Sequence, residues 1–345
     1  MITDAIKTLV EGHDLSAEET HIAMMQVMSG DASQTQISAF LVALRMKGET
    51  PDEIAGCARA MRAHVTPARP SRPDLVDTCG TGGDGLNTFN ISTSAALVAA
   101  AAGATVAKHG NRAMSSRTGS ADVLEALGVR IDLAPADVAE CIDSVGFGFL
   151  FAQAHHPAMR HVGPVRRELG IRTVFNLLGP LTNPAGARRQ VVGVYAESLV
   201  EPIAQVLAKL GAEHAMVVHG AGGLDELTPT GENLVSEVRD GDVRTYTLDP
   251  SPLSTGPGPG SPDDLRCGGD PAQNAAVILT VFDGERGPRR DAVILNAAAA
   301  LVVGGVVAEL EPGIDRAVET IDSGAALAKL QELVEFTRDR APVAG

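Results

Sequence analysis

The chain has 345 residues, 44% of them hydrophobic, and a formal net charge of −15. A chain of this length can bury one large core and a smaller one, so we expect two domains. The acidic balance argues against a nucleic-acid partner, because non-specific binding to a phosphate polymer needs a broad basic surface.

The first 70 residues are predicted to be helical. The tetrapeptides SAEE at 16–19 and TPDE at 50–53 both match the capping box that starts a helix, and the second has proline at the first helical position, where its missing donor costs nothing. Between them an apolar stripe follows helical spacing through Ile37, Phe40, Leu41 and Leu44. The sequence alone favours core packing for this stripe, with a partner surface as the alternative.

Residues 77–93 read DTCGTGGDGLNTFNIST, which predicts the end of a strand followed by a glycine-rich turn. Glycines allow left-handed backbone angles and a close approach to a ligand. The chain becomes alanine-rich from Asn90, so we expect a helix to begin near Ser92 with its free N–H groups and positive dipole end facing the turn. A phosphate fits such a place, although a glycine cluster alone is more typical of an ordinary turn.

The next strand is predicted at ATVA, residues 104–107, with KHGNR at 108–112 as its exit loop. Lys108 and Arg112 would bring positive charge to the same space. Glycine turn, helix start and cations together predict a pocket for a phosphorylated sugar. The GxxxxGK[ST] loop and the GxGxxG spacing are both absent, so we expect neither a P-loop nucleotide nor NAD.

After Pro73 short β-branched runs alternate with alanine-rich helices, which predicts an α/β fold with a largely parallel sheet covered on both faces. The loops GTGGD, KHGNR and HGAGGLDEL each follow a predicted strand and should meet at one edge of that sheet. Residues 251–265 are rich in proline and glycine and predict an exposed loop without chemistry. The strand candidates are LVDT (75–78), ATVA (104–107), QVVGVY (190–195), AMVVHG (215–220) and VRTYTL (243–248).

The cysteines have no CxxC pairing, which is typical of free thiols in a reducing compartment. Cys79 lies beside the glycine turn, but no base or metal-ligand spacing accompanies it, and we expect no catalytic role. The apolar run 295–308 is broken by glycines and too short for a membrane span, and the N-terminus lacks the pattern of a signal peptide. We therefore expect a cytoplasmic protein.

Several blocks in order resemble the anthranilate phosphoribosyltransferase family, whose members join anthranilate to phosphoribosyl pyrophosphate in tryptophan biosynthesis. KHGNR and its following serines also resemble the pyrimidine nucleoside phosphorylases, so that block indicates only the superfamily. The narrower assignment depends on GTGGD with NIST and on the Asp225–Glu226 pair. The remaining matching blocks are SADVLEALG (120–128), the stretch 156–184 that begins HPAMRHVGP, LDEL (224–227) and RDAVILNAAAAL (290–301).

The resemblance implies a fold like that of the nucleoside phosphorylases and phosphoribosyltransferases. A small all-helical lobe, residues 1–70, would be joined by helices from about 156–185. An α/β domain, residues 71–345, would carry the phosphoribosyl pyrophosphate site. Two copies of the chain would pair through the helical lobe.

Carried over position by position, the resemblance also implies the site residues. Anthranilate would contact Gly80, Asn111 and Arg166, and the planar fork of Arg166 suits a carboxylate. We interpret Arg167 and Arg172 as surface charges. The sugar and pyrophosphate contacts would come from Gly80, Gly83, Asp84, Thr88, Asn90, Ile91, Ser92, Thr93, Lys108, His109, Gly110, Asn111, Arg112, Ala113, Met114, Ser115, Ser116 and Ser120.

The reaction needs stabilisation of the leaving pyrophosphate and an aligned amine, and no protein nucleophile. Mg²⁺ prefers hard oxygen ligands, and Ser92, Asp225 and Glu226 are the predicted ones, with a solvated acidic turn as the alternative for the carboxylates. The catalytic candidates are His109, Lys108 and Arg166; His109 would orient the amine, with a structural histidine as the alternative.

Two other functions remain open at this stage. A pyrimidine nucleoside phosphorylase would share the KHGNR block and use inorganic phosphate with a nucleoside. A non-catalytic nucleic-acid-binding relative would use the same scaffold and would need a basic face. Fold alone does not decide between these functions.

Overall fold

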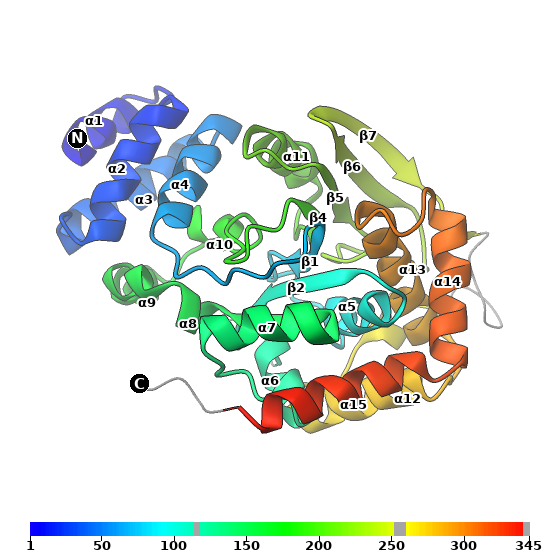
Figure 1. Ribbon diagram of the computed structural model, residues 1–345. Helices are drawn as coiled ribbons and strands as arrows, with labels where there is room; N and C mark the ends of the chain where they lie inside the picture. The colour runs from blue at the N-terminus through cyan, green and yellow to red at the C-terminus, as the bar shows by residue number, and fades with distance from the viewer. Residues whose placement is uncertain (114–117, 252–259, 341–345) are drawn as a thin grey trace.

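The computed structural model describes residues 1–113, 118–251 and 260–340, which form a helical lobe and a larger α/β domain (Figure 1). The lobe contains α1 (Ile2–Val10), α2 (Ala17–Ser29), α3 (Gln34–Lys47) and α4 (Pro51–Ala63). Both predicted capping boxes are confirmed, since the hydroxyls of Ser16 and Thr50 accept from the backbone N–H groups of Glu19 and Glu53.

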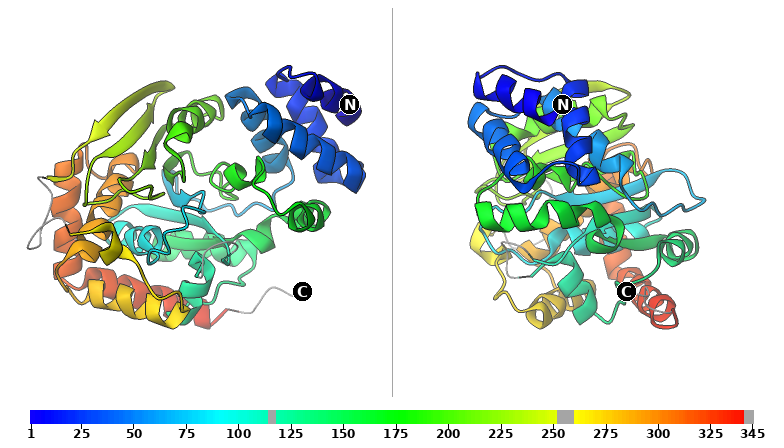
Figure 2. Two further views of the ribbon diagram at one scale, coloured as in Figure 1. Left: turned by 180° about the vertical axis from the view of Figure 1, so that it is seen from behind. Right: turned by 90° about the vertical axis from the view of Figure 1, so that its left-hand side faces the viewer.

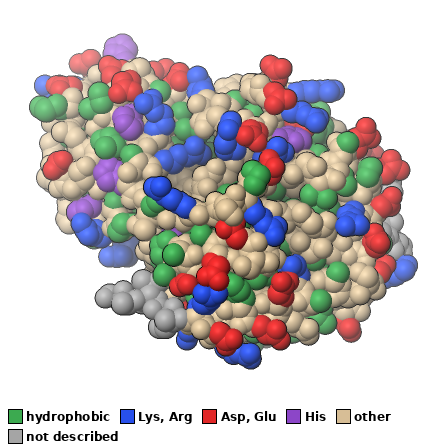
Figure 3. All heavy atoms as spheres, viewed as in Figure 1, with side chains coloured by type: hydrophobic (Ala, Val, Ile, Leu, Met, Phe, Trp, Pro, Cys, Tyr) green, Lys and Arg blue, Asp and Glu red, His purple; other side chains and the backbone are tan. Residues whose placement is uncertain are grey.

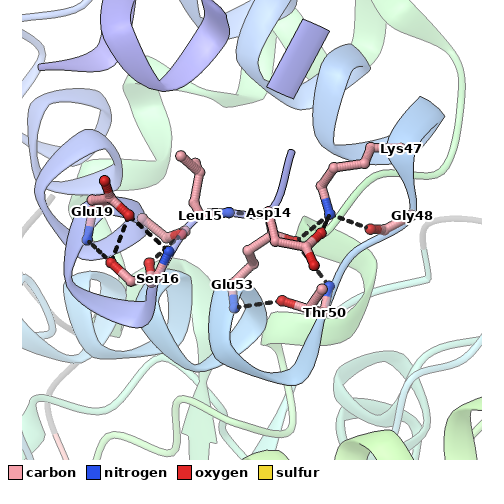
Figure 4. A network of polar contacts seen from close by, with 9 residues as sticks. Asp14, Leu15, Ser16, Glu19, Lys47, Gly48, Thr50 and Glu53 are labelled. Atoms are coloured by element: carbon pink, nitrogen blue, oxygen red, sulfur yellow. Dashed lines mark hydrogen bonds and ion pairs between the residues drawn. The ribbon is translucent and has the colours of Figure 1, made fainter. Parts of the chain in front are cut away.

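The Glu53 side chain forms the polar centre of the helical lobe (Figure 4). It is fully buried and accepts hydrogen bonds from the backbone N–H groups of Leu15 (3.0 Å) and Thr50 (2.8 Å). The Lys47 ammonium pairs with it at 2.9 Å and also reaches Asp14 at 2.6 Å. One carboxylate therefore ties the ends of three helices together, and both its oxygens accept hydrogen bonds from the protein.

The apolar stripe predicted on α3 lies in the core of the lobe, because Ile37, Phe40, Leu41 and Leu44 are each at most 1% exposed. The same hydrophobic cluster includes Val165 and Phe175 from the later helical segment. Core packing, the interpretation that the sequence favoured, is confirmed for this stripe.

The α/β domain is built on a seven-stranded sheet in the order β3-β2-β1-β4-β5-β6-β7. The first five strands are parallel, and β6 and β7 add to the edge in antiparallel orientation, so the predicted mostly parallel sheet is confirmed. All five strand candidates fall on strands, whereas the sequence reading missed β3 and β6. The strands are β1 (Leu75–Gly80), β2 (Thr105–Gly110), β3 (Phe147–Phe151), β4 (Arg189–Gly193), β5 (His214–His219), β6 (Asn233–Arg239) and β7 (Asp242–Leu248).

Helices cover both faces of the sheet (Figures 1 and 2). Successive strand residues point to opposite faces, and accordingly Val76 and Val106 belong to one hydrophobic cluster while Leu75 and Ala107 belong to another. The described helices and 3₁₀ turns of this domain are α5 (Ile91–Ala101), α6 (Ser120–Ala126), α7 (Pro135–Val145), α8 (Ala152–His155), η1 (Pro157–His161), α9 (Gly163–Leu169), α10 (Phe175–Leu178), η2 (Glu197–Leu199), α11 (Val200–Lys209), η4 (Pro262–Leu265), α12 (Pro271–Phe282), α13 (Pro288–Val303), α14 (Leu310–Asp322) and α15 (Ala325–Arg338).

Helix α13 is buried along nearly its whole length and packs against α5 through alanine-rich faces. The apolar run that begins at Leu295 is therefore part of the protein core. Among the described helices, none has the length and apolarity that crossing a membrane requires.

The lobe and the α/β domain are also joined by polar contacts. Arg62 on α4 donates from Nε to the carbonyl oxygen of Leu181 (2.7 Å) and from Nη1 to that of Leu210 (3.3 Å). Figure 3 shows lysine and arginine side chains gathered on the hollowed face between the two parts of the molecule.

Candidate functional site

Two loops distant in sequence meet the end of strand β2 at the carboxyl edge of the parallel sheet. The meeting at one edge was predicted, but Lys108–Gly110 of the predicted exit loop belong to β2 itself. The backbone N–H of Gly82 in the glycine loop donates to Oδ2 of Asp225 at 2.7 Å. The backbone N–H of Ser92 donates to Oε1 of Glu226 at 3.1 Å. Lys108 completes the junction, because its Nζ lies 3.4 Å from Oγ of Ser92.

Three glycines at neighbouring strand ends make this junction sterically possible. A Cβ on Gly80 would lie 2.7 Å from Oδ2 of Asp225. A Cβ on Gly193 or Gly220 would overlap the backbone carbonyl of Asp225 or Glu226. The sequence reading missed Gly193 and Gly220, because each stands alone in an ordinary strand-to-loop transition.

Helix α5 begins at Ile91, close to the predicted start. Its N-cap residue Asn90 makes no side-chain capping bond, and Glu226 accepts from the first turn instead. The Ile91 side chain is fully buried in the hydrophobic core, so the predicted substrate contact of this residue is reduced to its backbone. Thr93 is also fully buried, and its hydroxyl has no partner among the described residues.

The acidic loop carries carboxylates with raised pKa values. Loss of hydration, and then repulsion from Glu226 and Asp84, raises the pKa of Asp225 well above its usual range. Loss of hydration also raises the pKa of Glu226 to about 7, although Lys108 opposes that change. The folded chain thus holds three acidic groups that repel one another.

These groups fit a divalent cation. Oδ1 of Asp84 accepts from the backbone N–H of Leu86 at 3.0 Å, whereas Oδ2 is buried with no partner in the described part of the chain. Within that part, no three His, Cys, Asp or Glu side chains are close enough to hold a metal by themselves. The protein therefore offers hard oxygen ligands for part of a coordination shell, which suits Mg²⁺ because it usually keeps waters and substrate phosphates as ligands.

Lys108 is buried at this junction rather than exposed on its surface. Its side chain is only 2% exposed and its ammonium contacts the carbonyl oxygen of Thr78. The buried Asp77 lies nearby, and burial raises its pKa to about 6 while Lys108 opposes the shift. Oδ1 of Asp77 accepts from the backbone N–H of His109 at 3.0 Å, a positioning contact that the sequence reading did not identify.

Arg112 is already paired within the protein, which does not favour the phosphate contact predicted for it. Its guanidinium pairs with Asp122 at 3.1 Å and with Glu125 at 2.9 Å, and it lies 5.7 Å from the ring centroid of Phe151. The partners stand ten and thirteen residues away on α6, so the charge anchors this loop to the following helix.

The other predicted residues of this segment have structural partners of their own. The backbone N–H of Ala113 donates to Asp122, and the hydroxyl of Ser120 approaches the carbonyl oxygen of Asn111 and fills the space beside Gly110. Thr88 forms a single antiparallel bridge with Arg266. The predicted contacts of Met114, Ser115 and Ser116 lie outside the described residues.

His109 has protein partners at both ring nitrogens. Nδ1 lies 3.0 Å from the carbonyl oxygen of Gly179, which assigns a proton to Nδ1 and leaves Nε2, 3.1 Å from Nε2 of His156, as the acceptor. Burial lowers the pKa of His109 to about 3, so the ring is neutral at neutral pH. This geometry favours the structural alternative over direct orientation of the amine.

Arg166 is one of the cations that the described part of the chain leaves without an ion pair, and it is half-buried. Burial lowers the pKa of its guanidinium, which lies 5.5 Å from the ring centroid of Phe175 and makes no ion pair with any described residue. Arg167 is exposed, as expected. Arg172 is exposed too, as expected for a surface charge, but it also donates to the carbonyl oxygen of Gly83 and stacks on Tyr195.

Comparisons with known proteins agree with this geometry. A family model described as the a/b domain of a glycosyl transferase family matches residues 72–327, and the helical bundle domain of a glycosyl transferase family matches residues 3–65. The anthranilate phosphoribosyltransferase of Acetivibrio thermocellus is 55% identical over 337 residues, which cover 98% of this chain and 97% of the relative. That of Pelotomaculum thermopropionicum is 56% identical with the same coverage.

Solved structures of anthranilate phosphoribosyltransferases have the same fold as this chain. The crystal structure of anthranilate phosphoribosyltransferase from Thermus thermophilus superposes with a TM-score of 0.91 at 49% identity, covering 97% of this chain and 99% of that one. The Saccharomyces cerevisiae enzyme, solved with phosphoribosyl pyrophosphate and Mg, superposes with a TM-score of 0.86 at 30% identity and covers 98% of both chains.

Proposed function

The chain belongs to the anthranilate phosphoribosyltransferase family, and on that premise we propose how its residues divide the reaction. The enzyme transfers the phosphoribosyl group of phosphoribosyl pyrophosphate to the amine of anthranilate, in tryptophan biosynthesis. The relatives support this activity and neither alternative function.

The glycine loop and the start of α5 bind the phosphates. Backbone N–H groups and the dipole of an eleven-residue helix converge there, and Lys108 adds a full charge that is shielded from water. The bond from the anomeric carbon to pyrophosphate breaks as the amine forms a C–N bond, and the amine proton leaves to solvent. Fixed donors aimed at the leaving oxygens stabilise the charge that develops on them.

Mg²⁺ binds at Asp225 and Glu226, with Ser92 and Asp84 beside them. The support is the mutual repulsion of these carboxylates and the unpartnered Oδ2 of Asp84. The bound ion supplies positive charge for the leaving pyrophosphate. The Saccharomyces cerevisiae relative was solved with Mg, which agrees with this proposal.

Anthranilate binds through its carboxylate to Arg166. The guanidinium is largely removed from water and pairs with no protein carboxylate in the described chain. The carboxylate of anthranilate would therefore form the ion pair that the protein does not supply. The aromatic amine is unprotonated at neutral pH and needs no strong base. His109 and His156 hold neutral rings that shape the wall of the pocket.

We propose a homodimer through the helical lobe, a boundary between the domains near residue 70, and grouping of residues 156–185 with the lobe. The lobe leaves Met46 83% exposed and Val10 72% exposed, an apolar surface that a second copy would cover. All four cysteines are free, which supports a cytoplasmic location.

The observation that carries the assignment of the site is the junction of Gly82 with Asp225 and of Ser92 with Glu226. Fluorescence of anthranilate, followed with the protein, phosphoribosyl pyrophosphate and Mg²⁺, tests the activity, because conversion should reduce it. Unchanged fluorescence, together with phosphorolysis of a pyrimidine nucleoside, would overturn it. A gel shift at low salt tests the nucleic-acid alternative.

A further inference from the structure

Arg172 joins three elements that meet beside the phosphate pocket. It lies between α9, which carries Arg166, and α10. Its guanidinium donates a hydrogen bond to the carbonyl oxygen of Gly83 in the glycine loop. The same group lies over the ring of Tyr195, just beyond β4, with 4.1 Å between Cζ and the ring centroid.

The glycine loop is also attached at its base and middle, and just beyond the turn through the bond from the backbone N–H of Cys267 to the carbonyl oxygen of Asn87 and the bridge of Thr88 with Arg266. The backbone N–H of Thr81 donates to the carbonyl oxygen of Gly193 at 2.8 Å, and Oγ1 of Thr81 accepts from the N–H of Tyr195 at 3.2 Å. The N–H of Gly82 is held by Asp225. Arg172 adds the attachment at Gly83, at the far side of the turn.

Gly83 is suited to this contact by its lack of a side chain. Its φ is +85°, and a Cβ there would lie 3.1 Å from Nη2 of Arg172. The turn therefore presents its carbonyl to the guanidinium while its backbone remains open on the other side.

The Arg172 segment also contains the anthranilate contact proposed above. Arg166 packs over Phe175, three residues beyond Arg172, so this contact closes the short stretch that contains both arginines, and Arg172 attaches that stretch to Tyr195. A displacement of the glycine loop would pull on this stretch through the bond between Gly83 and Arg172.

We propose that Arg172 is a positioning residue that couples the two substrate sites, by holding the glycine loop to the segment that carries Arg166. This inference deepens the proposed function and rests on it. Phosphoribosyl pyrophosphate, by ordering the loop, places Arg166 for anthranilate. By thermodynamic reciprocity, a carboxylate on Arg166 raises the affinity of the loop for phosphoribosyl pyrophosphate by the same factor.

Calorimetry with phosphoribosyl pyrophosphate and Mg²⁺ tests the proposal, with and without benzoate, which keeps the carboxylate of anthranilate and lacks the reacting amine. We expect Arg172→Ala to weaken phosphoribosyl pyrophosphate binding about 10- to 150-fold, the range for the loss of one charged hydrogen bond. The parent should bind phosphoribosyl pyrophosphate more tightly when benzoate is present, and Arg172→Ala should lose that gain.

Matched variants separate positioning from folding. Arg167→Ala removes an exposed arginine from the same segment and should behave as the parent. Tyr195→Phe keeps the ring under the guanidinium and should be neutral, whereas Tyr195→Leu should reproduce part of the Arg172→Ala effect even if Arg172→Ala folds poorly. The coupling would be overturned if Arg172→Ala and Arg167→Ala bound phosphoribosyl pyrophosphate equally well, or if benzoate had the same effect on both variants. Turnover by the parent protein would still uphold the proposed function in that case.

Discussion

The helical lobe buries one acidic side chain beside a lysine, and the catalytic pocket holds two half-buried ones beside another lysine, yet the two regions treat them in opposite ways. In the lobe, Glu53 accepts two backbone N–H groups and the Lys47 ammonium (Figure 4). In the pocket, Asp225 and Glu226 each accept one backbone N–H, and their pKa values are raised. The lobe uses its carboxylate to hold helices together. The pocket gives each of its carboxylates fewer hydrogen-bond donors, so their negative charge can bind a cation.

The same contrast applies to two arginines with pKa values lowered by burial. Arg62 donates to two backbone carbonyl oxygens and links the lobe to the α/β domain. Arg166 has only the face of Phe175 among the described residues. A buried charge without its partner costs free energy, and a ligand of opposite charge recovers that free energy on binding.

The largest expected effect comes from neutralising the pocket. Asp225→Asn combined with Glu226→Gln should reduce turnover roughly 1000-fold, because stabilisation by a bound metal contributes several kcal/mol. Initial rates across a Mg²⁺ titration check this. Thermal unfolding without Mg²⁺ is the control: the double variant should be at least as stable as the parent, since it removes repulsion. Full activity at low Mg²⁺ would show that the metal binds elsewhere.

Neutralising Glu53 in the lobe should have the opposite effect, which is a loss of stability. Glu53→Gln leaves Lys47, which is 7% exposed, with the exposed Asp14 as its one acidic partner besides the carbonyl oxygen of Gly48, and should lower the free energy of unfolding by about 3 kcal/mol. Urea unfolding measures the loss, and the Mg²⁺ dependence of the folded fraction should not change. Asp14→Asn is the matched control, because Asp14 is 67% exposed and its removal should cost less than about 1 kcal/mol. Equal losses in both variants would contradict a central role for Glu53.

Removing the guanidinium of Arg166 should weaken the binding of anthranilate and not that of phosphoribosyl pyrophosphate. Arg166→Ala should raise the Michaelis constant for anthranilate while leaving phosphoribosyl pyrophosphate affinity nearly unchanged, since a charged bidentate contact contributes about 1.5 to 3 kcal/mol, or roughly 10- to 150-fold. Aniline lacks the carboxylate, so it should be a poor substrate for the parent, and Arg166→Ala should reduce the rate with aniline only slightly further. Arg167→Ala serves as the control. A similar loss for both amines would assign Arg166 to the fold or the sugar site.

The sequence was sufficient where a feature depends on neighbouring residues. The glycine loop, the start of α5 and the capping boxes are local patterns, and each lies where the pattern predicts. Strand β3 was missed because FGFLF is a short, buried aromatic run without alternation, and periodicity cannot distinguish such a run from a helical segment. Strand β6, NLVSEVR, mixes polar and apolar residues and gave too weak a signal.

Partners brought together by the fold could not be predicted from local patterns. Arg112 stands in a motif that suits phosphate, but its ion pairs come from the next helix. Arg172 looks like one of several surface arginines until the fold brings it to Gly83. Gly193 matters because a loop more than thirty residues later crosses over it, and no spacing in the sequence records that approach.

The smallest expected effect is a pH dependence that distinguishes the pocket from the lobe. The pKa of Glu226 is raised from 4.5 to about 7, so between these values the folded chain holds a proton that the unfolded chain has lost. Stability without Mg²⁺ should therefore fall as pH rises through this window, by about 1–2 kcal/mol after allowance for solvent screening.

Urea unfolding from pH 4.5 to 8 measures this fall, with Glu226→Gln as the comparison, since the amide cannot titrate and its curve should be flatter. Added Mg²⁺ should stabilise the parent more at pH 8 than at pH 5, because below pH 7 the metal must displace the proton. The Glu226→Gln variant should lose that pH dependence of metal stabilisation. If parent and variant lose stability in parallel, the proton is held by another group, and the contrast between a satisfied lobe carboxylate and an unsatisfied pocket carboxylate would not extend to Glu226.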